Sequence, residues 1–146
     1  MDLTSKFSLL EDKDTSQAFE ALKELEKLSD TSDVLYTYLD KFTEMIDSEK
    51  YVIRCRGFRL YCKQARWDYK NKIDASIIRA LVILNDDKPT AVRQALASLH
   101  DVVHHKKELI EIIREKVTQI DYLRYKDTMH GLISKDIQNL LNEMSN

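Results

Sequence analysis

A row of basic side chains in the middle of the chain has the residue types and spacing for binding chemistry. Its central members recur at spacings of three, four and three residues, which places them on one face of a helix predicted over residues 49–66. Aromatic residues Tyr61, Trp67 and Tyr69 are interleaved with them, an arrangement suited to gripping phosphates or an acidic partner while rings stack. The alternative is a solvated helix face. We call this set the basic strip: Arg54, Arg56, Arg59, Lys63, Arg66, Lys70 and Lys72.

The charge of the chain is uneven along its length. Residues 1–48 contain 12 acidic and 5 basic residues, whereas residues 49–85 contain 3 acidic and 9 basic residues. The formal net charge of the whole chain is nevertheless −2, and its pI is about 6.1. A dedicated duplex binder is usually basic overall, so the balance weighs against that class. The acidic first third could instead neutralise the basic strip.

Three residues of the last third have a spacing that could hold a divalent metal. His100, His104 and Glu108 stand four residues apart in succession, and two histidines at this spacing can chelate zinc on one helical face. The His-Glu-x-x-His pattern of metalloproteases is absent, and we expect the helix to end near His105. Histidines in a last turn interact favourably with the helix dipole. We therefore favour capping and surface roles, keep these three residues as weak metal candidates, and expect no cofactor.

No constellation of catalytic residues is visible. Trp67 beside Asp68 is an aromatic–acid pair that a base-excising enzyme could use, but a single tryptophan at a joint is usually a packing wedge. Cys55 and Cys62 lie two helical turns apart, about 10.5 Å, which is beyond disulfide reach. We expect reduced, core-filling thiols, with a reactive thiol pair as the alternative. We assign no catalytic residue and favour a protein without enzymatic activity.

The composition indicates the elements that must position these residues. The 146 residues include only 2 glycines and 1 proline, whereas sandwiches and barrels need a turn residue about every ten positions. Hydrophobic residues make up 43% and charged residues 33%, a balance that excludes a compositionally disordered tail. We therefore predict an all-α fold. We also expect Gly57 to permit a close approach of two helices or to relieve crowding at Phe58.

Self-similarity divides the chain into three units. Apolar positions of three predicted helices superimpose without gaps at offsets of 35 and 39 residues, and each helix is followed by a second amphipathic segment. Such helix pairs cannot bury their apolar faces alone, so they stack and share one core. The chain is thus predicted to be a single domain, 1–146, with capping helices at both ends. Its parts are a leading helix within residues 1–10, units at about 12–47, 48–85 and 86–121, and a C-terminal cap at 122–146.

Residues 87–99 carry a specific resemblance. The stretch resembles the first helix of a HEAT-type repeat, with an acidic turn, a proline near the helix start and the pair Val92-Arg93. The middle unit matches this pair with Ile53-Arg54, whereas the first unit has Ala18-Phe19 in that place. The whole chain is similar to small single-domain bacterial HEAT-like proteins that are often labelled SufBD-like. The resemblance implies a right-handed α-solenoid of about three HEAT-like helix pairs and no settled activity.

The expected function follows from the repeat architecture. Stacked helix pairs present a concave surface, lined mainly by the second helices, that suits peptides, helices or whole proteins. We expect a non-catalytic protein–protein interaction or scaffold module, monomeric or weakly homo-oligomeric. The alternative is a nucleic-acid-binding protein related in fold to the HEAT-like alkylpurine DNA glycosylases and using the basic strip. No apolar run approaches the roughly 20 residues of a membrane helix, and no signal peptide is visible, so we expect a cytoplasmic protein.

Overall fold

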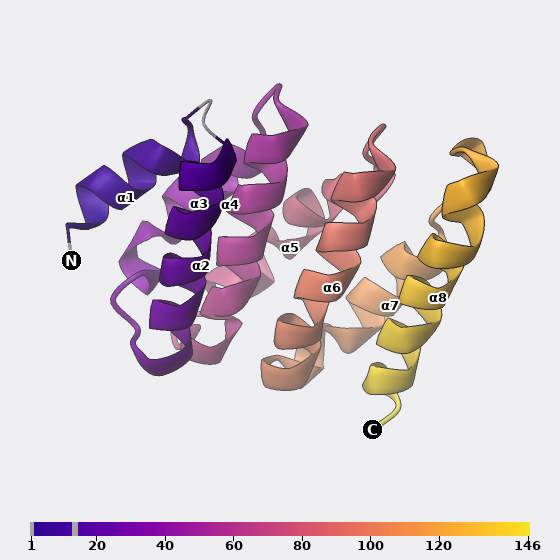
Figure 1. Cartoon of the computed structure of the whole chain (residues 1–146). Coiled ribbons are helices and arrows are strands. Elements are labelled where there is room, and N and C mark those ends of the chain that lie inside the picture. The colour runs from indigo at the N-terminus through magenta and orange to yellow at the C-terminus, as the bar shows by residue number, and fades with distance from the viewer. Residues whose placement is uncertain (1, 13–14) are drawn as a thin grey trace.

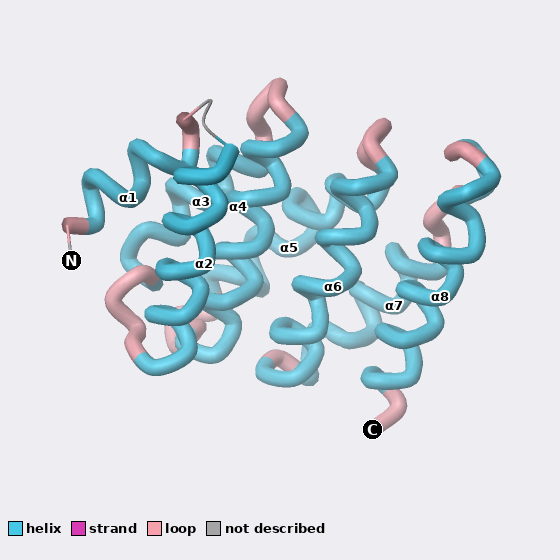
Figure 2. Tube along the Cα trace, in the orientation of Figure 1, coloured by secondary structure: helices cyan, strands magenta, loops and turns pink. Residues whose placement is uncertain are grey.

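The computed structural model describes residues 2–12 and 15–146, and every regular element within these ranges is a helix (Figure 2). The α-helices are α1 (Leu3–Leu10), α2 (Thr15–Thr31), α3 (Leu39–Ile46), α4 (Tyr51–Lys63), α5 (Lys72–Ala80), α6 (Pro89–His105), α7 (Ile110–Thr118) and α8 (Asp127–Met144). Short 3₁₀ turns precede or extend several of them. The prediction of an all-α fold is confirmed for the described residues.

The helices form two rows (Figure 1). Helices α2, α4, α6 and α8 stand side by side in what we call the front row, and α3, α5 and α7 lie behind them in the back row. The front row is continuous because α4 packs against both α2 and α6, and α6 packs against α8. The back-row helices fall within the segments 34–46, 73–84 and 109–120 that the hydrophobic period predicts as second helices, with bounds shifted by one residue for α5. α1 packs against α2 at one end of the row.

One hydrophobic cluster runs through the molecule from Phe7 in α1 to Met144 in α8. In the closing helix, Ile133 and Leu140 are buried, as the amphipathic pattern predicts. The same pattern predicts that Leu132 also faces inward, but this residue is 41% exposed. The reason is that the buried stripe of α8 repeats at spacings of three and four residues from position 133, which leaves position 132 outside it.

The joint before α6 is built differently from the expected cap. Pro89 is the first residue of α6, as predicted, because its missing N–H has no partner to lose there. The sequence favours Asp86 or Asp87 as the capping residue, but the N-cap position is Lys88, which makes no side-chain cap. The Asp86 carboxylate accepts a hydrogen bond from the Lys88 N–H at 2.9 Å, outside the helix. It is held in that position by Arg54 of the preceding unit.

Gly57 brings α4 against α3. A Cβ atom at this position would lie 2.5 Å from the Met45 Cβ and 2.8 Å from the Phe42 carbonyl oxygen. Both distances are below ordinary van der Waals contact, so only a residue without a side chain fits the observed helix spacing. The expected close helix approach is confirmed.

Both cysteines are free and buried in α4. Burial raises the pKa of the Cys55 thiol to about 11, and burial also raises the pKa of Cys62. Because the thiolate is the reacting species, we expect Cys55 in the folded protein to react with Ellman's reagent at pH 8 about 100-fold more slowly than an ordinary thiol. Denatured protein provides the control and should release two equivalents at once. Rapid labelling of the folded protein would instead support the reactive thiol pair.

Candidate functional site

The structure ties most of the basic strip to acceptors inside the chain. Arg54 makes a bidentate pair with Asp86, with its Nε 2.7 Å and its Nη2 3.0 Å from the two carboxylate oxygens. Its Nη1 also donates to the carbonyl oxygens of Ser48 and Glu49, each at 2.9 Å. This arginine therefore joins the middle unit to the turn before α6. Its guanidinium is engaged on every side by the protein itself.

Two further strip residues are neutralised by acidic residues of α2. Arg59 makes a bidentate pair with Glu26, at 3.1 and 2.8 Å, and the Lys63 Nζ lies 2.9 Å from Asp30. Arg66 donates to the main-chain carbonyl of Asp30 at the end of the same helix. Acidic residues of the first third of the chain thus face the basic strip, in agreement with the interpretation that they neutralise it. Ion pairs of this kind are partly exposed, so they fix the position of α4 relative to α2 more than they add to the free energy of unfolding.

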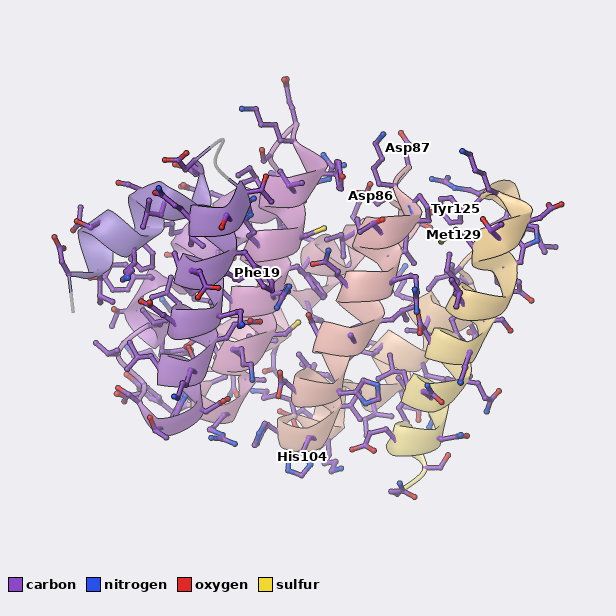
Figure 3. The ribbon with its side chains drawn as sticks, in the orientation of Figure 1. Phe19, Asp86, Asp87, His104, Tyr125 and Met129 are labelled. Atoms are coloured by element: carbon purple, nitrogen blue, oxygen red, sulfur yellow. The ribbon has the colours of Figure 1, made fainter. Side chains whose placement is uncertain are left out.

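Two arginines that the predicted 39-residue offset aligns make similar contacts. Arg54 and Arg93 occupy the same place in the predicted second and third units. Each makes a bidentate pair with an aspartate further along the chain, Asp86 for Arg54 and Asp136 for Arg93, with the Nε at 2.7 Å in both cases. The first unit has Phe19 at this place, and its side chain is 45% exposed on the side of α2 that faces α4 (Figure 3). The arginine series therefore begins only at the second unit.

Arg56 is the one residue of the basic strip that is buried, and it has no acidic partner among the described residues. Its side chain is buried, with the residue 8% exposed, and its Nη1 donates to the Leu10 carbonyl at 2.6 Å. Among residues 2–12 and 15–146, no carboxylate forms an ion pair with it. Burial lowers the pKa of its guanidinium below the usual value. A buried cation held by a neutral acceptor alone is energetically costly.

The linker end of the strip is only partly available. The Trp67 indole donates to the Ser29 carbonyl at 2.7 Å, so this ring closes the joint between α2 and α4. Tyr61 is fully buried, whereas Tyr69 is 70% exposed and carries Lys70 above its ring at 5.7 Å. Lys72 opens α5. Of the three interleaved aromatics, Tyr69 alone presents most of its ring to solvent.

A buried polar cluster joins the second and third units behind the linker. The Asp68 carboxylate accepts from the Tyr36 hydroxyl at 2.5 Å and from the main-chain N–H groups of Lys72 and Ile73 at 2.9 and 3.0 Å. The latter two bonds start helix α5. The ammonium of Lys106 approaches Asp68 at 3.0 Å. Asp68 therefore fixes α5 relative to both neighbouring units.

Lys106 is the centre of this cluster. It also lies 3.0 Å from the Asn71 side-chain oxygen and 2.5 Å from the Asp74 carboxylate. Asn71 has a positive φ of 54°, a conformation that asparagine adopts more readily than most residues. Hydrogen bonds to these carboxylates raise the pKa of Lys106 against the opposing effect of burial. Sequence reasoning missed Lys106, because a lysine just past a helix end carries no periodic signal.

The structure separates the weak metal candidates. His100 and His104 lie on α6, which ends at His105, and Glu108 lies beyond that end in the 3₁₀ turn Lys107–Leu109. The Glu108 carboxylate pairs with Lys106 at 3.3 Å, and the His104 ring packs edge-on against His105. Within the part of the chain that the structure describes, no group of three or more His, Cys, Asp or Glu residues is placed to hold a metal ion.

Three adjoining hollows on the front row meet at Arg59, which lines all of them. One lies between α2 and α4 and has Phe19 and Val52 in its wall. The second extends towards α6, and the third runs along α2. We call this surface the front face; it includes Phe19, Glu26, Val52, Arg59, Gln94, Ala97 and Asp101. It combines apolar, acidic and basic groups rather than one sign of charge.

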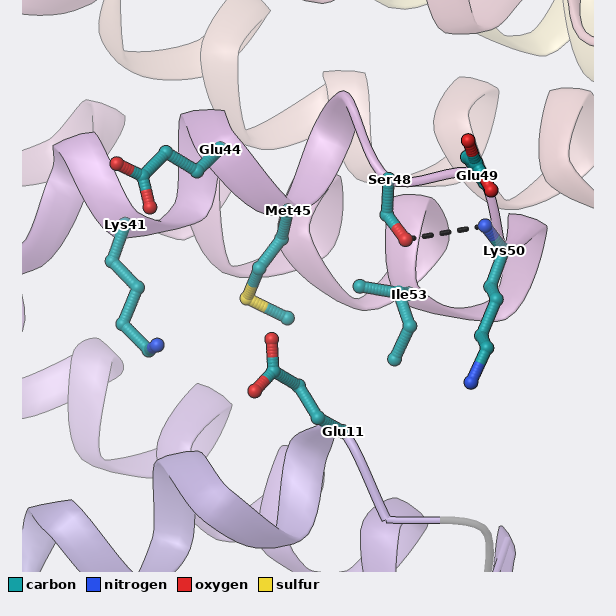
Figure 4. A pocket seen from close by; sticks show the side chains of 8 residues that line it. All are labelled: Glu11, Lys41, Glu44, Met45, Ser48, Glu49, Lys50 and Ile53. Carbon is teal, nitrogen blue, oxygen red and sulfur yellow. Dashed lines mark hydrogen bonds between the residues drawn. The ribbon is translucent and has the colours of Figure 1, made fainter.

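A separate hollow of about 490 Å³ lies where the end of α1 meets α3 and α4 (Figure 4). Three glutamates and two lysines line it around Met45 and Ile53. The Ser48 hydroxyl accepts from the Lys50 N–H at 3.1 Å at its rim. The lining residues carry charges of both signs, and no nucleophile–base pair is present among those that the structure describes.

No family model, no curated protein and no solved structure matches this chain. None of the described helices is long and apolar enough to cross a membrane.

Proposed function

We propose that this chain is an α-solenoid of about three HEAT-like helix pairs that acts as a non-catalytic protein-binding module through its front face. The observation that carries the proposal is the meeting of three hollows at Arg59, across α2, α4 and α6. The equivalent pairs Arg54–Asp86 and Arg93–Asp136 support the repeat assignment. The back row, which the repeat pattern favours for binding, also has a hollow, of about 310 Å³, with Asp47, Arg79 and Val82 in its wall. Unlike the front face, it does not extend over α2, α4 and α6.

The composition of the front face supports a protein partner. Its apolar side chains are surrounded by polar and charged groups, of which Arg59 and Glu26 pair with each other, an arrangement like the apolar centre and polar rim of protein interfaces. A nucleic acid would require unpaired cations, but five of the seven residues of the basic strip donate hydrogen bonds to acceptors within the chain. The observations therefore favour a protein segment as the occupant over a phosphate backbone.

The test compares two substitutions that add the same side chain to different rows. Ala97→Arg places a long side chain in a hollow of the front face, whereas Ile78→Arg places one at an exposed position of α5 in the back row. Tagged wild-type protein and both variants are used for affinity capture from cells of the source, and the recovered proteins are quantified by mass spectrometry. We expect a partner that is retained by Ile78→Arg and reduced at least tenfold by Ala97→Arg, because the long side chain occupies the hollow.

Three outcomes would contradict this proposal. They are equal capture by both variants, loss with Ile78→Arg alone, and recovery of no protein by the wild type. A mobility-shift measurement with duplex and single-stranded DNA at low and high salt tests the nucleic-acid alternative directly. We expect unchanged mobility at both salt concentrations, since true phosphate binding would weaken steeply with salt.

A further inference from the structure

One hollow of the front face differs from the others in its chemistry. It lies between α2 and α4, and its walls carry the apolar side chains of Phe19, Leu22, Tyr51 and Val52. Its volume of about 180 Å³ is smaller than the roughly 300–1,000 Å³ of small-molecule pockets, and is suited to a single side chain. We call it the Arg56 pocket, because Arg56 also lines it.

Among the described residues, the Arg56 pocket has a positive charge without an acidic partner. None of the described lining residues is an aspartate or glutamate, and the second guanidinium in its wall, Arg59, is already paired with Glu26. Arg56 is buried, yet its one acceptor among the described residues is the neutral carbonyl of Leu10. A guanidinium has five N–H donors, so most of its capacity remains for a ligand. A carboxylate would be the natural counterion because it accepts a guanidinium bidentately.

The first unit leaves this space open for a structural reason. The second and third units fill the equivalent position with an arginine that reaches an aspartate, whereas the first unit carries Phe19. The Phe19 ring remains partly exposed at the mouth of the Arg56 pocket, with the Lys23 ammonium 5.2 Å from its centroid. An apolar rim above a buried cation recognises a ligand that is apolar at one end and anionic at the other.

We propose, building on the protein-binding function above, that the Arg56 pocket receives an apolar side chain of the partner that is adjacent to a carboxylate. The apolar group contacts Phe19 and Val52, and the carboxylate pairs with Arg56. The carboxylate has two possible sources with the same chemistry: the C-terminus of the partner, or an aspartate or glutamate next to the apolar residue. A test with defined probes separates them.

Two pairs of probes differ only in charge. N-acetyl-leucine and its amide represent a C-terminus, and the amidated dipeptides acetyl-Leu-Asp and acetyl-Leu-Asn represent an internal acid. Each is titrated into ¹⁵N-labelled full-length protein while backbone amide shifts are recorded. We expect the carboxylate member of at least one pair to bind at least tenfold more tightly than its amide, because hydrogen bonds between charged groups are stronger than those to a neutral amide. The saturating shifts should be centred on Phe19, Val52 and Cys55, which line the Arg56 pocket.

Variants assign the two ends of the ligand. Arg56→Gln should remove the preference for the carboxylate while leaving the weak binding of the amide unchanged, a result that a merely structural role would not produce. Phe19→Ala, at a position that is 45% exposed, should weaken the binding of both probes at least threefold. This variant tests the apolar end of the ligand independently of whether Arg56→Gln folds. Val34→Ala, another exposed apolar residue, provides the matched control and should change nothing.

The proposal for the Arg56 pocket is overturned if carboxylate and amide bind equally in both pairs, if no probe gives saturating shifts, or if the shifts lie elsewhere. It is also overturned if Phe19→Ala binds like the wild type. These outcomes leave the protein-binding function intact, because that function is decided separately by Ala97→Arg in the capture experiment. Loss of capture by Ala97→Arg together with no probe binding would mean that the front face binds its partner without this contact.

Discussion

Replacing Gly57 with alanine is expected to destabilise the fold by about 2–3 kcal/mol, which corresponds to a fall in Tm of about 5–10 °C. The added Cβ would meet the Met45 Cβ at 2.5 Å and the Phe42 carbonyl at 2.8 Å. One of these contacts is with the main chain of α3, which cannot rotate away as a side-chain tip can, so α3 and α4 must separate. Thermal and urea unfolding followed by circular dichroism measure the effect.

The chain contains its own control for this substitution. Gly131 lies inside α8, and a Cβ at that position has no neighbouring atom within 4 Å. Gly131→Ala should therefore stabilise the protein by about 0.5–1 kcal/mol, the intrinsic preference of a helix for alanine. The two variants make the same chemical change, and their effects on the free energy of unfolding are expected to have opposite signs. A Gly57→Ala protein as stable as the wild type would show that the two helices are not held at the observed spacing.

Replacing Lys106 with methionine is expected to destabilise the fold by about 3–5 kcal/mol. The ammonium group lies 3.0 Å from Asp68 and 2.5 Å from Asp74, and the Asp68 side chain is fully buried. Removing the cation leaves Asp68 as an uncompensated buried charge, although its hydrogen bonds to Tyr36 and to the start of α5 remain. Urea unfolding at neutral pH measures the loss.

A neighbouring lysine and a compensating substitution make this prediction specific. Lys107→Met, one residue along the chain at an exposed position, should change the free energy of unfolding by no more than about 0.5 kcal/mol. Adding Asp68→Asn to Lys106→Met should recover part of the loss, because the orphaned charge is removed together with its partner. Additive effects of the two substitutions would contradict the assignment of Asp68 and Lys106 as a coupled pair.

Which charges would pair was not predictable from local patterns. The basic strip is recognisable because its residues recur on one helical face, and the acidic character of residues 1–48 is plain from composition. Whether Arg59 meets Glu26, and Lys63 meets Asp30, depends on two front-row helices whose contacting residues are 33 positions apart. A helical period describes one helix and carries no information on the rotation of its neighbour. The same limit hides the lack of an acidic partner for Arg56 among the described residues, because this lack becomes visible only when the surrounding helices are in place.

The helical class, the approximate helix bounds and most of the buried stripe were predictable from the amino-acid order, because the scarcity of glycine and proline and the hydrophobic period act locally. The close approach at Gly57 was also indicated, since a glycine inside a helix needs a packing reason. The folded chain was needed to reveal that Lys106 is buried among carboxylates, that Asp86 pairs with Arg54 instead of capping α6, and that a hollow remains beside Phe19. Each of these three features depends on contacts between helices that are far apart in the sequence. The interaction free energy at such contacts depends on distances between side chains that no local stretch of sequence specifies.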